Sequence, residues 1–139
     1  MNASSDRLLR RTLWANAVLS VGSGVLLVAL AGPLARLATR APVEVMGLDL
    51  AGMLALVGAG FVAFGAACGW IASRPQMPLG WARAIFALDA AWVVISAGLL
   101  LLPVSWTTAG IAGIVVVALI VADLAILEYL GLRKIAAAT

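Results

Sequence analysis

The sequence predicts an all-α protein, a four-helix transmembrane bundle of up-down-up-down topology with one domain over residues 1–139. The chain is 65% hydrophobic and only 11% charged, and its mean hydropathy is +1.16, whereas soluble domains contain about 25% charged residues. The charges leave three long gaps, which are the 24 residues between Arg11 and Arg36, the 24 between Asp49 and Arg74, and the 33 between Asp89 and Asp123. Each gap is long enough for a transmembrane helix, which needs roughly 20 apolar residues.

Apolar runs and the polar or proline-containing stretches between them predict four spans, at about 10–31, 48–72, 81–102 and 106–130. In the first connection, Pro33 favours a short interfacial helix from Leu34 to Thr39. The second connection contains Pro75 and Pro78, which predict a tight turn. The third is only a few residues around Pro103, so spans three and four are expected to be antiparallel neighbours.

The basic residues predict that both termini are cytoplasmic. In that orientation only Arg36 and Arg40, of the nine Lys and Arg residues, lie outside. Cytoplasmic loops carry the excess of positive charge in multi-pass proteins, so an N-in, C-in protein of the cytoplasmic membrane is expected. A cleaved signal peptide is an alternative for the first span, because basic residues precede it and Ala29-Leu30-Ala31 resembles a cleavage site. The length of the apolar stretch favours the span.

Missing residue types narrow the chemistry. The chain has no histidine and a single cysteine, Cys68, so histidine-ligated metal or haem and dithiol redox chemistry are not expected. No glycine-rich phosphate-binding loop is present. Little chain remains outside the spans for a catalytic or nucleic-acid-binding domain. We therefore expect no enzymatic activity, no cofactor and no nucleic-acid partner, and the lipid bilayer is the expected environment.

Polar residues inside the spans are the candidate functional residues, because a charge near the bilayer centre costs at least about 2.5–3.5 kcal/mol. Spans one and three are diagonal in this topology, so Asn16 and Asp89 are expected to point into the centre, with Asp123 arriving from span four. Trp92 lies one turn from Asp89 and is expected to donate its indole N–H to a carboxylate. Ser96 continues the same polar face.

Two interpretations of this candidate cluster stay open. Asn and Ser side chains commonly hydrogen-bond between transmembrane helices, at about 0.6 kcal/mol per contact. Asp89 and Asp123 would serve either proton exchange or ion pairing with Arg10, Arg11 or Arg83 of a neighbouring helix.

Two further pairs are predicted to be structural. Glu128 lies near the end of span four, where an interfacial ion pair with Arg133 is expected. Gly65 and Gly69 form a small-xxx-small pair that lets helices approach closely. Such packing serves either a neighbouring span of the same chain or a seam with a partner.

Spans one and three share a spacing pattern. Arg10, Asn16 and Ser23 are separated by six and seven residues, and Arg83, Asp89 and Ser96 repeat this spacing 73 residues later. A duplication of two tandem helical hairpins would give this pattern. Coincidence among few residue types is the alternative, because spans two and four do not align.

Three short segments carry a resemblance. They are Arg11-x-x-Trp14-x-Asn16-Ala17-x-x-Ser20, Asp89-x-x-Trp92-Val93-x-x-Ser96 and Glu128-Tyr129-Leu130-Gly131-Leu132-Arg133. With them the chain resembles a broad group of small bacterial four-span integral membrane proteins of unknown function. The resemblance implies the architecture and a bacterial inner membrane, and it implies no activity.

Three functions are compatible with the sequence. The first is a non-enzymatic accessory or assembly subunit, packed in a homodimer or a larger membrane complex. The second is a small proton-coupled transporter that uses Asp89 and Asp123. The third is a binding site for a lipid, quinone or pigment, with Trp92 and the serines as its polar contacts.

Overall fold

The computed structural model describes the backbone of residues 3–137 and the side chains of residues 6–137. Its four long helices are α1 (Ala3–Ala29), α3 (Leu50–Ser73), α4 (Leu79–Leu101) and α5 (Thr108–Ala136). All four are long and apolar enough to cross a membrane, which makes the chain compatible with an integral membrane protein. The all-helical fold class and the four spans are as expected.

The helix ends follow from local chemistry. Asp6 lies in the first turn of α1 and pairs with Arg10 at 2.9 Å, so this helix begins before the expected residue 10. Asp49 caps α3 by accepting a hydrogen bond from the Gly52 N–H at 2.7 Å. Thr107 caps α5 in the same way, at 3.0 Å from Gly110 N.

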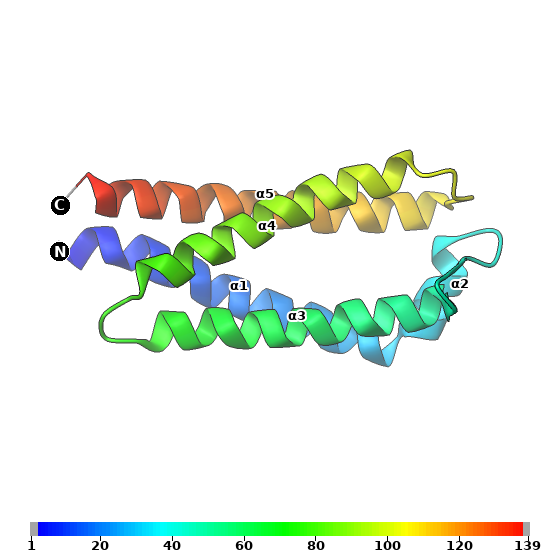
Figure 1. Cartoon of the computed structure of the whole chain (residues 1–139), viewed down its shortest axis with the longest axis horizontal. Coiled ribbons are helices and arrows are strands. Elements are labelled where there is room, and N and C mark those ends of the chain that lie inside the picture. Colours follow the sequence, from blue (N-terminus) through cyan, green and yellow to red (C-terminus); the bar gives the residue numbers. More distant parts are fainter. Residues whose placement is uncertain (1–2, 138–139) are drawn as a thin grey trace.

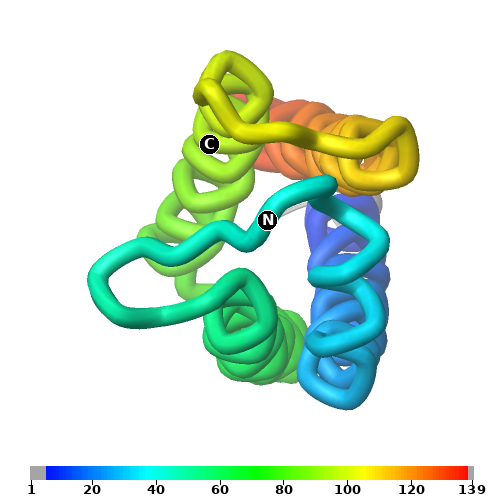
Figure 2. Tube along the Cα trace, turned by 90° about the vertical axis from the view of Figure 1, so that its right-hand side faces the viewer, coloured from blue at the N-terminus to red at the C-terminus, as the bar shows by residue number. Residues whose placement is uncertain are grey.

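The long helices form a four-cornered bundle (Figure 2). Helix α1 packs on α3, α4 packs on α5, and α1 also packs on α5, whereas α3 and α4 scarcely touch. Helices α1 and α4 therefore occupy opposite corners, and α4 and α5 are neighbours, as the short third connection predicts. The two ends of the chain lie at one end of the bundle (Figure 1), which we call the termini end. The opposite end carries a short β-hairpin at residues 44–49, and we call it the hairpin end. Which end faces the cytoplasm stays a prediction.

Glycines allow the backbones of α1 and α3 to approach each other closely. A Cβ atom on Gly65 would lie 2.8 Å from the Ala17 carbonyl oxygen, and one on Gly58 would lie 2.7 Å from the Gly24 oxygen. Gly65 therefore packs against a neighbouring span of the same chain. Gly69 does not share this close approach, because its Cβ would make only ordinary contact with the Trp14 ring, at 3.6 Å.

Short elements cover the hairpin end. Helix α2 (Ala31–Ala38) has Pro33 in its first turn, where the proline costs no helical hydrogen bond. It begins three residues before the expected interfacial helix. A two-stranded antiparallel hairpin, β1 (Glu44–Val45) and β2 (Leu48–Asp49), follows. Its turn has positive φ at Met46 (55°) and Gly47 (81°), a conformation that glycine adopts readily.

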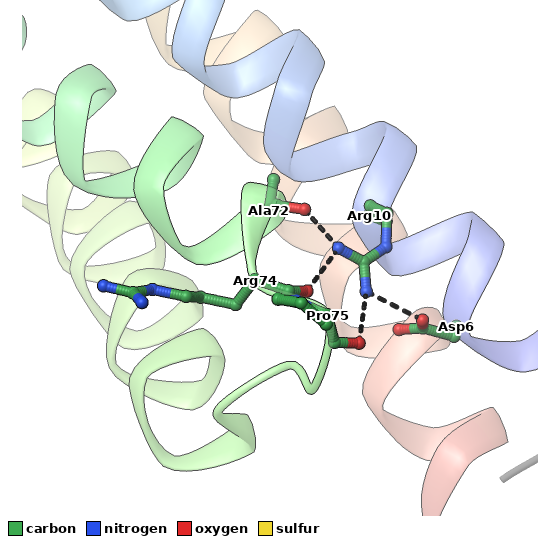
Figure 3. Close-up of polar contacts among 5 residues, drawn as sticks. All are labelled: Asp6, Arg10, Ala72, Arg74 and Pro75. Atoms are coloured by element: carbon green, nitrogen blue, oxygen red, sulfur yellow. Dashed lines mark hydrogen bonds and ion pairs between the residues drawn. The ribbon is translucent and has the colours of Figure 1, made fainter.

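The termini end is closed by a basic clamp and an apolar plug. Arg10 donates to the carbonyl oxygens of Ala72, of Arg74 at 2.8 Å and of Pro75 at 3.5 Å, so it ties the α3–α4 loop to α1 (Figure 3). These carbonyls end a helix and have few other partners, and a cation there is favourable. The apolar plug consists of almost fully buried side chains, among them Leu9, Leu13, Cys68, Ile71 and Ile135.

Candidate functional site

Four buried or half-buried polar side chains from three helices form one hydrogen-bonded group, which we call the acid–amide cluster: Asn16, Ser20, Asp89 and Glu128. The Asn16 Nδ2 donates to Asp89 Oδ2 at 2.5 Å and to Glu128 Oε1 at 3.0 Å, and the Ser20 hydroxyl donates to Asn16 Oδ1 at 3.0 Å. Asn16, Asp89 and Glu128 are respectively 1%, 4% and 0% exposed. One amide thus joins two carboxyl groups that lie 39 residues apart in the chain.

The structure brings Asn16 and Asp89 together, as the diagonal arrangement predicts, but the third member is Glu128 and not Asp123. Asp123 is exposed on α5 and is absent from the cluster. Positions 123 and 128 are five residues apart, which places their side chains about 140° apart around a helix, so they cannot share a face. The expected ion pair of Glu128 with Arg133 does not form, because the glutamate is buried against Asn16 instead.

Trp92 and Ser96 lie near the cluster without joining it. The Trp92 Nε1 is buried and has no hydrogen-bond partner, so the expected indole bond to a carboxylate is not made. Its ring packs edge-on against Phe61 of α3, with 4.8 Å between ring centroids. Ser96 is 3% exposed, about two turns beyond Asp89, and no hydrogen bond links it to the cluster.

The basic residues expected as partners of the aspartates do not pair with them. Arg10 holds Asp6 and the α3–α4 loop (Figure 3), and Arg11 and Arg83 are exposed. In the part of the chain that the structure describes, neither Asp89 nor Glu128 forms an ion pair with Lys or Arg. The two carboxyl groups therefore lack a positive counter-charge among the described residues.

A cavity of about 350 Å³ begins at the cluster and is lined by all four long helices. Asn16, Ser20 and Asp89 provide its polar part. The remaining lining is apolar or aromatic and includes Phe61, Phe64 and Trp92, with Ser23 as a further polar residue; the other residues are Leu19, Val57, Gly60, Leu88, Ala91, Ile95, Val117, Ile120, Val121 and Leu124. This volume and a largely apolar lining with few polar groups are typical of small-molecule sites.

The cavity lies beside the weakest contact between neighbouring long helices, that between α3 and α4. Gly60 on α3 and Leu88 and Ile95 on α4 line it and are exposed. The two helices diverge from their connecting loop toward the hairpin end (Figure 1). Toward the termini end, the apolar plug separates the cluster from the surface. In a membrane, this geometry gives access from the lipid and closes the nearest aqueous route.

Glu128 was not predicted to belong to the site, because its position near the end of the span favoured an interfacial role. The residues on the same face of the helix indicate that it is buried. Leu124, Ala125, Gly131 and Ile135 recur at helical spacing around Glu128, and all four are buried. Gly131 in particular lies against α1, where a Cβ atom would be 2.9 Å from the Leu9 Cβ. A glutamate between small residues on one face is thus turned inward.

Comparison with known proteins adds no family to this geometry: no protein-family model, no curated protein and no solved structure matches the chain. Among the described residues, no group of three or more His, Cys, Asp or Glu side chains is arranged to hold a metal ion. The site is therefore described from its own residues, as a cavity between the four long helices with the carboxyl group of Asp89 in its lining.

Proposed function

We propose that the protein is a non-enzymatic integral membrane protein that binds a hydrophobic small molecule in the cavity between its four long helices. The observation that carries the proposal is the cavity itself, about 350 Å³ in volume, apolar along most of its length and polar at one end. Packing alone would favour filling such a space, because empty volume in a helix bundle destabilises it. Lateral access between α3 and α4 supports a ligand that partitions into the bilayer.

A matched pair of glycine variants tests this function. A Cβ atom added at Gly60 or at Gly98 would meet nothing within 4 Å. Gly60 lines the cavity, whereas Gly98 does not. An uncharged photoactivatable aryl diazirine, added to the protein in lipid bilayers, should label Phe61 and Trp92 more strongly than the lipid-facing Val94. Gly60→Leu should suppress the labelling at Phe61 and Trp92, and Gly98→Leu should leave it unchanged. Labelling that follows surface exposure alone, with Val94 highest, would refute the proposal.

A second function, assembly with a membrane partner, is favoured by Asp123. Its side chain is exposed on α5, about 15 Å along the helix from Arg133. A charge at this depth against lipid costs at least about 2.5–3.5 kcal/mol, and contact with a polar group of a partner would remove that cost. Native mass spectrometry after mild extraction tests it: a second subunit that is lost in Asp123→Leu supports assembly, and a monomer in both forms contradicts it.

A further inference from the structure

We propose that the ligand of this cavity is an organic cation with hydrophobic substituents, bound with its charge beside Asp89, which Asn16 links to Glu128. This inference rests on the proposed ligand-binding function and specifies its ligand class. The charge lies at the polar end of the cavity, and the substituents occupy the space between Phe61, Trp92 and the aliphatic side chains. Charge balance, the position of Asp89 in the cavity lining and the aromatic wall each support this assignment.

The first support is the sign of the charge around the cluster. Two carboxyl groups share a neutral amide, and the side chains nearest to them are also neutral. Ser20 comes from α1, and the buried thiol of Cys68 is the titratable group that faces both acids from α3. A buried carboxylate without a counter-charge is strongly unfavourable. A cation supplies that charge, whereas an anion would be repelled.

The second support is the position of the Asp89 carboxyl group, which lines the cavity. Glu128 lies outside that lining and is 0% exposed. The Asn16 Nδ2 already donates to both acids. Because a buried carboxylate is strongly unfavourable unless it is paired, the cavity favours a ligand that brings positive charge to Asp89.

The third support is the aromatic wall. Phe61 and Trp92 meet edge to face at 4.8 Å, and both line the cavity within about one helical turn of the cluster level. Aromatic faces attract cations, by about 2 kcal/mol or more where water is excluded. Acid groups at one end and aromatic rings beside them form a combination that recognises ammonium or phosphonium ions with hydrophobic groups.

Binding of the cation is coupled to the release of a proton. Two buried carboxyl groups bridged by one amide, to which no basic side chain of residues 6–137 is paired, retain a proton when the cavity is empty. A monovalent cation replaces that proton, so one charge enters and one leaves. Acidification therefore weakens cation binding, by up to about tenfold per pH unit for exchange of a single proton.

The test compares two ions of nearly the same shape and opposite charge, tetraphenylphosphonium and tetraphenylborate. Equilibrium dialysis of the full-length protein in detergent should show saturable binding of the phosphonium and none of the borate. Asp89→Asn should weaken phosphonium binding by about tenfold or more. Glu44→Gln is the control, an exposed carboxyl group on β1 outside the cavity, and should bind as the unmodified protein does. A proton should be released for each phosphonium bound, measured on the unmodified protein in weak buffer.

Equal binding of the two ions, or phosphonium binding without proton release, would overturn the cation assignment. An unfolded Asp89→Asn variant does not remove the test, because the ion comparison and the proton release use the unmodified chain. The neutral diazirine separates the two proposals. If it labels the cavity while neither ion competes with it, the ligand class is wrong and the binding function stands. If it does not label the cavity, the binding function itself fails.

Discussion

Substituting the glycines between α1 and α3 should separate the bundle at its tightest contact. In Gly65→Ala the new methyl carbon would lie 2.8 Å from the Ala17 carbonyl oxygen and 3.0 Å from the Val21 nitrogen, whereas ordinary contact begins at 3.4 Å. Both neighbours are backbone atoms and cannot rotate away, so the helices must move apart by about 0.6 Å at this level. Overpacking of this kind costs about 1–3 kcal/mol.

Gly60→Ala is the matched control for this substitution, five residues away on the same helix. A Cβ at Gly60 meets nothing within 4 Å, and alanine is favoured over glycine in a helix by up to about 1 kcal/mol. Circular dichroism during heating in detergent should show Gly65→Ala melting roughly 3–10 °C below the unmodified protein, with Gly60→Ala at or above it. Equal melting temperatures for the two variants, or a gain in Gly65→Ala, would refute the close approach of α1 and α3.

Three other perturbations have defined outcomes. Asn16→Ala removes the amide donor that Asp89 and Glu128 share and should lower the free energy of unfolding by about 1–3 kcal/mol, measured by denaturant titration in mixed micelles; an unchanged midpoint would contradict the cluster. Arg10→Met frees the loop carbonyls and should lower the melting temperature by several degrees, with partial recovery in Arg10→Lys. Cys68, 0% exposed in the apolar plug, should react with maleimide only after denaturation; rapid reaction of the folded protein would show that the plug is open.

Much of the fold could be predicted because the bilayer imposes a length on each helix and excludes charge. The gaps between charged residues predicted the four long helices. Most of the predicted helix ends lie within a few residues of the observed ends. The larger differences arise at the ends of the chain. Helix α1 starts at Ala3 and α5 continues to Ala136, since a charged residue can extend a helix beyond the apolar span. Periodicity of apolar residues carries no information about such extensions.

The site was predicted in part, for a geometric reason. Asn16 and Asp89 could be paired because the topology places their helices diagonally and their depths agree. The choice between Asp123 and Glu128 depended on the rotation of α5 about its own axis, which depth alone does not fix. That rotation is set by the buried face containing Ala125 and Gly131. The Met46–Gly47 turn was likewise missed, because a two-residue strand has too short an alternation to recognise.

The central claim is that a ligand enters the cavity between the four helices, and the indole signals of the protein test it most directly. The chain has five tryptophans, of which Trp92 lines the cavity, whereas Trp14, Trp70 and Trp81 are exposed and Trp106 donates to the Leu99 carbonyl at 3.3 Å. In ¹⁵N-indole-labelled protein in micelles, with the Trp92 signal assigned by Trp92→Phe, tetraphenylphosphonium should shift that signal saturably and leave the other four nearly unchanged. Shifts at the exposed tryptophans with a stationary Trp92 signal would contradict the account.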